Sequence, residues 1–484
     1  MIRPLLALAA ALLLGACEKE DPGPASLTCD RTNIVLGDEA GAETAFTVDA
    51  SGPWRLTIEG EGFDASPRRG GRGRTRVTIA ATDDHPEGVA LRRLGGIDLR
   101  LDGGGARTTL DVLQRPARSE QTVLMYFPWS GNLTSYFQQN IEDMAQAAAQ
   151  RGLQEERLLV FFMPSDSEAR LLEIYCDGGE SRQTVHRIYD DVPAFTTAEG
   201  IASVLDEVKR TAPAARYAMT IGSHGMAWLP ASGERSATAA RSEVREREYW
   251  EYVAEGRPLT RWFGGTSSAD RTDIATLAEA LKRTGMKMEY ILFDGCYMSS
   301  VEVAYELQKV AERLIGSTCE VMGYGFPYAT MGLHLLGTPD YRAACDAFYD
   351  FYIHYDYPYG TIGVTECAET ERLAELMRLI NTDHRFDTGG IDRLQRLDGY
   401  TPVRFFDMGD YVRQLCGDAA LLARFEEQLA RTVPYHRHTP EYYSMSNGHY
   451  TPIRTFSGIT TSDPSVSPMT IDTKLRTAWW QATH

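Results

Sequence analysis

Residues 291–298 read ILFDGCYM, and residues 219–225 read MTIGSHG. Each stretch is an apolar run that ends abruptly in small residues around one reactive side chain, Cys296 in the first and His224 in the second. An uninterrupted apolar run is typical of a strand buried on both faces of a parallel sheet. Because ligands of such sheets bind beyond the carboxyl ends of the strands, we expect His224 and Cys296 at a functional edge.

The pattern around these two stretches, along residues 118–484, alternates between apolar strands and longer helical segments. Further strands are expected at 123–127, 158–162 and 314–316. Helices are expected at about 135–150, 197–211, 272–284, 297–312, 370–382 and 406–433. The alternation predicts an α/β fold, in which a mainly parallel sheet carries helices on both faces.

The segment 27–116 has a different pattern, with short alternating runs separated by turns rich in Gly, Asp and Pro. The runs that we expect to be strands lie at 45–48, 54–58, 76–79, 97–101 and 109–113. Short strands at this spacing predict a small all-β sandwich that precedes the α/β domain.

The first seventeen residues have the features of an export signal. Arg3 precedes an apolar run from Leu5 to Leu14 that is too short to span a bilayer comfortably. Residues 14–17 read LGAC and resemble the bacterial lipobox, which implies lipidation of Cys17; an ordinary signal peptide is the alternative. Residues 18–26 are polar and predict a tether, and their acidic start resembles the export tag of Bacteroidetes lipoproteins. The resemblance implies an outer-membrane lipoprotein exposed at the cell surface and held to the membrane by its lipid.

The composition excludes some classes of partner. The chain has 49 basic and 67 acidic residues and a formal charge of −18. This balance argues against nucleic-acid binding, which favours a basic face. If Cys17 is lipidated, seven of the eight cysteines remain, so at least one thiol stays free outside the cell. No pair is spaced as CxxC, and we expect no metal site of the zinc-knuckle kind.

The context of Cys296 favours a nucleophile. We expect the chain to become helical directly after it, and a cysteine at a helix N-terminus has its thiolate stabilised by the exposed N–H groups. A thiolate is the state that covalent catalysis requires. The alternatives are an inert buried cysteine, a structural role for His224, and an Asp294 that only caps the helix.

The order of His-Gly (224–225) and Asp-Gly-Cys (294–296), each after a strand, resembles the clostripain family of cysteine peptidases, which has a caspase-like fold. Residues 126–133, 298–307 and 406–411 extend the resemblance over most of 120–470. It implies a polypeptide substrate and an endopeptidase that forms a thioester. No cofactor is required by the sequence, although the family resemblance makes calcium possible.

The resemblance also implies roles for particular residues. Cys296 attacks the scissile carbonyl, and His224 transfers protons. The N–H groups of Gly225 and Cys296 form the oxyanion hole. Asp294 selects arginine, or lysine, at the P1 position of the substrate, since a buried cation needs a paired acid. Glu320 is a further candidate for the same pocket.

Two other segments carry expectations. The segment 27–116 resembles a BACON domain through Trp54 and the closing residues 112–114, which implies glycan binding; a spacer is the alternative. Residues 231–262 are charged, with little apolar periodicity, and predict an exposed insertion. We expect self-cleavage there, at one of three arginines: Arg241, Arg245 or Arg247.

Two rival functions remain compatible with the sequence. One is a surface lipoprotein that binds glycans or proteins and whose peptidase-like domain is inactive. The intact set of His224, Asp294 and Cys296 argues against it. The other is a caspase-like peptidase with a different P1 preference, and an acid at position 294 argues against cleavage after acidic residues.

Overall fold

The computed structural model describes residues 24–189, 192–229, 264–265, 271–468 and 471–484. The predicted signal and most of the tether, and also the expected insertion with its three arginines, lie outside the described residues. The chain forms two compact units, each with its own apolar core. The first contains residues 24–36, 40–83 and 94–112, and the second contains the rest.

The first unit is built from two β-sheets, as the alternating pattern predicts. One sheet has the order β1-β3-β7-β5 and the other β2-β9-β8-β4-β6. The strand bounds are Leu27–Cys29 (β1), Asn33–Leu36 (β2), Glu43–Ala50 (β3), Trp54–Gly60 (β4), Phe63–Ser66 (β5), Arg69–Gly70 (β6), Gly73–Ala81 (β7), Arg92–Leu101 (β8) and Arg107–Gln114 (β9). Trp54 is fully buried in the core between alternating apolar side chains. Its ring lies so close to Gly70 that a Cβ there would come within 2.5 Å of it.

The second unit is organised around a nine-stranded sheet with the order β13-β12-β11-β10-β14-β15-β16-β17-β19. The five strands from β11 to β16 in this order run parallel to one another. Their bounds are Ser119–Phe127 (β10), Glu156–Ser165 (β11), Ala214–Gly222 (β14), Met288–Asp294 (β15) and Ala311–Gly316 (β16). All five expected strands are therefore present, and their apolar residues are buried.

Antiparallel strands flank the parallel core on both sides. Their bounds are Glu168–Asp177 (β12), Glu180–Tyr189 (β13), Thr361–Glu366 (β17) and Tyr435–His438 (β19). The sequence did not predict these four, because polar residues interrupt β12, β13 and β19. Residues 434–470, expected to be irregular, also contain three short strands: Glu441–Ser444 (β20), His449–Pro452 (β21) and Thr460–Thr461 (β22). β22 pairs with Phe406–Asp407 (β18).

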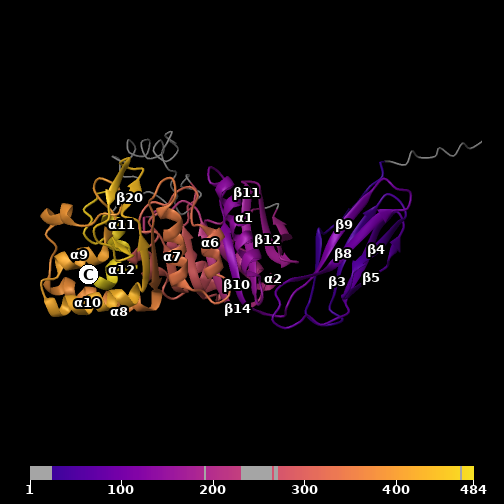
Figure 1. Ribbon diagram of the computed structural model, residues 1–484, viewed down its shortest axis with the longest axis horizontal. Helices are drawn as coiled ribbons and strands as arrows, with labels where there is room; N and C mark the ends of the chain where they lie inside the picture. Colours follow the sequence, from indigo (N-terminus) through magenta and orange to yellow (C-terminus); the bar gives the residue numbers. More distant parts are fainter. Residues whose placement is uncertain (1–23, 190–191, 230–263, 266–270, 469–470) are drawn as a thin grey trace, which may run out of the picture. The chain divides into compact units, whose positions relative to one another are not determined.

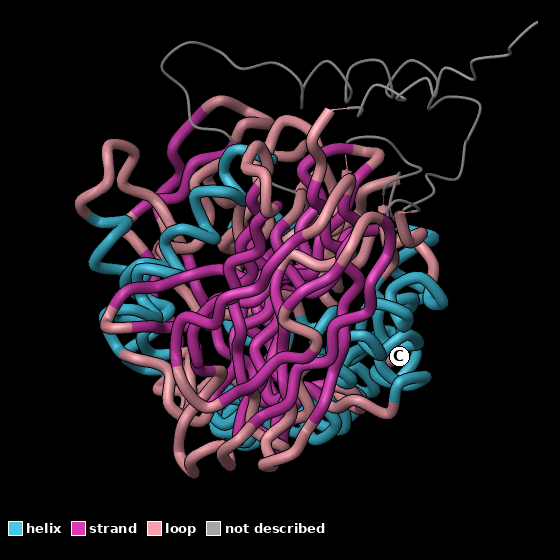
Figure 2. The backbone as a smooth tube through the Cα atoms, turned by 90° about the vertical axis from the view of Figure 1, so that its right-hand side faces the viewer, coloured by secondary structure: helices cyan, strands magenta, loops and turns pink. Residues whose placement is uncertain are grey.

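Helices cover both sides of the sheet, as expected (Figure 1, Figure 2). One layer contains Thr134–Arg151 (α1), Tyr328–Met331 (α6) and Tyr341–Ile353 (α7). The other contains Ala198–Thr211 (α2), Ile274–Thr284 (α4), Val301–Leu307 (α5), Thr370–Asp383 (α8), Ala419–Thr432 (α10) and Ala478–Thr483 (α12). Met408–Leu415 (α9) and Ile471–Arg476 (α11) complete the set of longer helices described.

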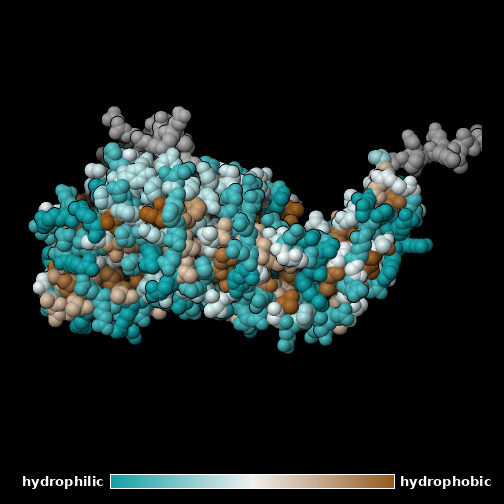
Figure 3. Space-filling model, viewed as in Figure 1, coloured by the Kyte–Doolittle hydropathy of each residue, from teal (hydrophilic) through white to brown (hydrophobic). Residues whose placement is uncertain are grey.

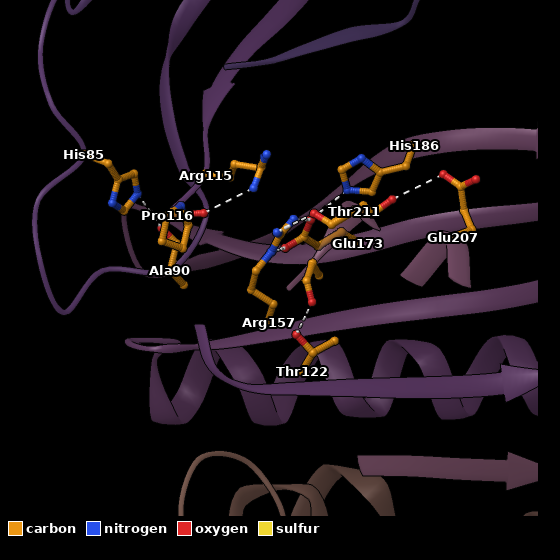
Figure 4. Close-up of polar contacts among 11 residues, drawn as sticks. His85, Ala90, Arg115, Pro116, Thr122, Arg157, Glu173, His186, Glu207 and Thr211 are labelled. Carbon is orange, nitrogen blue, oxygen red and sulfur yellow. Dashed lines mark hydrogen bonds and ion pairs between the residues drawn. The ribbon is translucent and has the colours of Figure 1, made fainter. Parts of the chain in front are cut away.

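A buried charged cluster ties the edge strands to the parallel core (Figure 4). Arg157 on β11 is fully buried and donates to both carboxylate oxygens of Glu173 on β12, at 2.7 and 2.6 Å. His186 on β13 contacts the same carboxylate through Nε2 at 2.7 Å. Arg157 also donates to the carbonyl of Thr211 at the end of α2. Arg157 and the other contacts hold the pKa of Glu173 down at about 2, although burial raises it.

The surface is mainly polar. The face seen in Figure 3 is predominantly hydrophilic, with scattered apolar residues. Among the described residues, the large apolar side chains that are exposed are Val89, Ile188, Leu379, Tyr450, Val466, Ile471 and Leu475. None of the described helices has the length and apolar composition that a membrane span requires.

Candidate active site

The site lies where two neighbouring parallel strands end. β14 and β15 pair in register up to Gly222 and Asp294. The pairing continues one step further, because the Ser223 N–H donates to the carbonyl of Asp294 at 3.3 Å. The residues that follow each strand include His224 and Cys296. The sheet therefore brings together the two stretches that the sequence singled out, although they lie far apart along the chain.

Gly225 lies against the backbone of Cys296. A Cβ on Gly225 would lie 2.5 Å from the Cys296 carbonyl oxygen and 2.9 Å from its amide nitrogen. No side chain fits there without displacing backbone atoms. The backbones of the two residues therefore lie in close contact.

The chain after Cys296 makes a strained turn instead of entering a helix. Tyr297 has a φ of 63°, which is unusual for a bulky residue. Its N–H donates to the Cys319 carbonyl at 3.0 Å, and its ring stacks on Phe405 at 4.5 Å between centroids. The helix α5 begins only at Val301, with Ser300 as its N-cap.

The expectation that a helix N-terminus stabilises the Cys296 thiolate is therefore wrong, since residues 297–300 separate the sulfur from the helix. The same finding excludes Asp294 as the cap of that helix. A nearer donor to the sulfur is present in the loop after β16. The Val321 N–H lies 3.3 Å from Cys296 Sγ and can donate to a thiolate. Hydrogen bonding to the charged form favours that form.

His224 is oriented by residues that the sequence did not single out. Its Nε2 lies 3.2 Å from Oδ1 of Asn132, in the loop between β10 and α1. The Trp129 ring lies against the imidazole, with 5.0 Å between centroids. The backbone N–H of His224 donates to the Gly264 carbonyl at 3.2 Å. Asn132 lies within residues 126–133, one of the segments that resemble the clostripain family. That resemblance was the signal in the sequence that could have pointed to Asn132.

Asp294 is buried at the end of β15. Its Oδ1 accepts a hydrogen bond of 3.1 Å from the N–H of Phe326. The loop from Met322 to Phe326 thus wraps around this carboxylate, and a tight turn shapes it, because the Gly325 N–H donates to the Met322 carbonyl at 2.9 Å.

Glu320 is buried and already has three hydrogen-bond donors. The Tyr297 hydroxyl donates to it at 2.8 Å and the Met445 N–H at 3.0 Å, and the Ser444 hydroxyl is the third donor. Burial raises the pKa of its carboxyl. Its contacts connect it to the strained turn after Cys296.

The chemistry of the described residues does not point to a metal. Within the described ranges, His, Cys, Asp and Glu side chains nowhere gather in threes or more as a metal site would require. All seven cysteines in the described residues are free thiols.

Comparisons with known proteins agree with this arrangement. A profile described as Peptidase_C11, Clostripain family, matches residues 248–382. A secreted C11 cysteine protease from Bacteroides thetaiotaomicron, "iotapain", is 50% identical, with a TM-score of 0.68. That match covers 76% of this chain and 100% of the other. No curated protein matches the chain.

More distant structures share the fold. An inactive zymogen of a C11 protease from Parabacteroides distasonis is 25% identical over 76% of this chain and 99% of the other, with a TM-score of 0.62. A second secreted C11 protease from Bacteroides thetaiotaomicron, bound to an irreversible peptide inhibitor, is 21% identical, with a TM-score of 0.61. It covers 75% of this chain and 98% of its own.

The fold and these matches define a cysteine peptidase with a mainly parallel, caspase-like sheet. The identity to iotapain over that whole protein shows the family. The chain belongs to the clostripain family, C11.

Proposed function

We propose that this peptidase cleaves peptide bonds after arginine or lysine, with Cys296 as nucleophile and His224 as its proton-transfer partner. The observation that carries the proposal is the end of the β14–β15 pair. There Gly225 lies so close to the Cys296 backbone that a Cβ would come within 2.5 Å of its carbonyl oxygen, so the position requires glycine. Two N–H donors in one region suit the oxyanion of an acyl-transfer reaction.

The mechanism follows from these groups. The Cys296 thiolate attacks the scissile carbonyl carbon, and the carbonyl oxygen becomes an oxyanion facing the N–H groups of Gly225 and Cys296. The C–N bond breaks as protonated His224 gives its proton to the leaving amine, which leaves a thioester. His224 then takes a proton from water, and the resulting hydroxide attacks the thioester. The C–S bond breaks, the product leaves with its new carboxyl group, and the Cys296 thiolate and protonated His224 are regenerated.

The specificity is proposed to come from Asp294. It lies two residues before the nucleophile, and it is buried, so an incoming cation would meet an acid from which water is largely excluded. Charge pairing is strong in such surroundings. For Glu320, which the sequence predicted to belong to the same pocket, the contacts support a different role. It positions Cys296 by holding the Tyr297 hydroxyl.

Maturation is proposed to involve self-cleavage near Arg241, Arg245 or Arg247. Cys296 is fully buried and His224 is 1% exposed, so a substrate needs a change in the surroundings to reach the sulfur. The related protease from Parabacteroides distasonis is an inactive zymogen, which supports activation by cleavage. Calcium dependence, which the family resemblance makes possible, is tested by measuring peptide cleavage with and without EDTA. No step of the mechanism uses calcium.

The N-terminal part is proposed to be a BACON-like domain on a chain lipidated at Cys17 and exposed on the outer membrane. Its compact unit with a separate core supports an independent module. It acts as a spacer or binds glycans, and a glycan array with the full-length Cys296→Ala protein distinguishes these roles. Incorporation of labelled palmitate that a Cys17→Ala variant loses would support the anchor.

The central experiment measures cleavage of four fluorogenic peptides that differ only at P1: Arg, Lys, Asp or Ala. We expect residues 18–484 to cleave the first two, and the Cys296→Ala variant to cleave none. Absence of cleavage of all four, also after mild trypsin treatment that mimics maturation, would overturn the proposal and favour the binding-protein alternative.

A further inference from the structure

A second acid lies beside the loop that wraps around Asp294. Asp143 is on α1, and its side chain is buried, with 6% of its surface exposed. Its Oδ2 accepts a hydrogen bond from the hydroxyl of Tyr324, which belongs to that loop. Its Oδ1 accepts from Gln139 at 2.9 Å. No basic side chain among the described residues forms an ion pair with Asp143.

Contacts with two helices hold Tyr324 in place. Its ring stacks on Phe351 of α7, with 5.0 Å between centroids and 18° between the planes. Its carbonyl accepts a hydrogen bond of 3.0 Å from Asn140 on α1. The residue is half-buried, so part of its side chain stays accessible. The position of the ring therefore depends on two helices of the same layer.

Tyr324 also lies within electrostatic reach of Asp294. Burial raises the pKa of the Tyr324 phenol, and the hydrogen bond to Asp143 and the charges of Asp143 and Asp294 raise it further. Phe326, two residues after Tyr324, donates its N–H to Asp294 at 3.1 Å. Tyr324 is therefore a bridge from the pocket acid to the acid on α1.

The direction of the hydrogen bond matters for recognition. The Tyr324 hydroxyl gives its proton to Asp143, so its oxygen lone pairs can accept N–H groups. A carboxylate behind the phenol makes that oxygen a stronger acceptor. An arginine side chain carries five N–H donors in a planar fork, whereas lysine has one compact ammonium. An acid and a second acceptor oxygen, connected by one short loop, thus suit the fork better than the single ammonium.

We propose that Asp143, acting through the Tyr324 hydroxyl, is a second anchor of the P1 pocket and selects arginine over lysine. This inference rests on the proposed cleavage after basic residues. Asp294 contacts one part of the guanidinium, and the Tyr324 oxygen contacts another. Asp143 is a positioning residue, since it orients and polarises the hydroxyl without touching the substrate.

The test uses full-length protein and peptides that differ only at P1, which is Arg, Lys or citrulline, the uncharged analogue of arginine. Asp143→Asn is expected to lower kcat/KM for the Arg peptide by about tenfold or more, which is the range for a hydrogen bond to a charged group. The Lys peptide should lose less than about threefold, because one ammonium is satisfied by Asp294. The preference for Arg over citrulline should also fall.

Two further variants make the result decisive. Tyr324→Phe should reproduce the loss, and the double variant should lose little more than either single one, because both changes break the same contact. Glu142→Gln, an exposed neighbour on α1, is the matched control and should change none of the ratios. The thermal midpoint and the rate of Cys296 alkylation report whether each variant keeps its fold.

Three results would overturn the inference. Equal losses on Arg and Lys peptides in a folded Asp143→Asn protein would show a structural role only. Additive losses in the double variant would show that Asp143 does not act through Tyr324. If the wild-type enzyme cleaves neither the Arg nor the Lys peptide, the proposed function itself is wrong, and the inference that rests on it falls with it.

Discussion

Two histidines of the catalytic unit have opposite surroundings. His186 contacts the carboxylate of Glu173, which also binds Arg157 through two hydrogen bonds, and all three groups lie in the interior or at its margin. His224 contacts the neutral amide of Asn132 and lies at the strand end beside Cys296. The first arrangement has the residue types of a catalytic acid–histidine pair, yet a buried arginine already neutralises its acid.

The difference teaches that the neighbours of a histidine, and not its type, indicate its role. Arg157 and His186 occupy both carboxylate oxygens of Glu173, so the cluster joins three strands and leaves no free acid for chemistry. Asn132 orients His224 without adding a charge. The described side-chain contact of His224 is thus with a neutral amide, whereas that of His186 is with a carboxylate.

The largest expected effect is the loss of catalysis at the strand ends. Cys296→Ala and His224→Ala should each lower kcat/KM by at least about 10³-fold. The first change removes the nucleophile, and the second removes the group that transfers protons. His186→Ala should change kcat/KM by less than about threefold. An active enzyme that loses its activity in His186→Ala while remaining folded would contradict the comparison.

The second effect is on stability. Glu173→Gln leaves Arg157 buried beside a neutral amide, and we expect the free energy of unfolding to fall by about 3–5 kcal/mol. Urea denaturation measures it. Glu168→Gln is the matched control, because Glu168 pairs with Arg170 on the exposed surface. That change should cost less than about 1 kcal/mol.

A third buried acid sharpens the comparison through its opposite response to pH. Burial and the charge of Asp463 raise the pKa of Glu302 from 4.5 to about 7. Its raised pKa favours the protonated form in the folded state, so stability falls as pH rises from about 4.5 to about 7. Glu302→Gln should therefore raise stability by about 3 kcal/mol at pH 8 and by little at pH 4.

For Glu173 the dependence of stability on pH has the opposite sign. Its pKa of about 2 in the folded state lies below its ordinary value of 4.5, so its contribution is present above pH 4.5 and is lost as pH falls toward 2. Unfolding measured at pH 3, 4, 5 and 8 separates the two acids. A Glu302→Gln gain that is equal at pH 4 and pH 8 would contradict the assignment.

The smallest effect tests the comparison directly by making His224 resemble His186. Asn132→Asp places a carboxylate next to the imidazole, and we expect the alkaline limb of the kcat profile to move up by about one pH unit. Asn132→Ala should lower kcat by about tenfold without that shift, because the imidazole loses its orientation. Identical pH profiles for the two variants would show that Asn132 does not orient His224.

Much of the fold was predictable because local pattern and tertiary burial agree. β14 and β15 are apolar over most of their length, and their abrupt ends in small residues are enough to mark the site from the amino-acid sequence. The edge strands β12 and β13 were not predictable in this way. Their partly exposed, polar sequences carry a weaker signal, and Glu173 is buried only because Arg157 is supplied by β11.

The missed parts of the site depend on contacts between distant segments. The chain after Cys296 has a helical pattern, yet the Tyr297 N–H is bound by the Cys319 carbonyl, and this contact holds the turn open until Ser300. Likewise, nothing in the local sequence links Asp143 to Tyr324, which lies 181 residues further along. Propensity does not encode such pairs, since tertiary context decides them.

The direct pairing of β14 with β15 has a consequence for the chain as a covalent object. The backbone hydrogen bonds of the sheet, and the close contact of Gly225 with the Cys296 peptide, hold the two reactive residues together. The pairing of the two strand ends is therefore a property of the hydrogen bonds of the sheet and not of the long covalent path that joins the two strands.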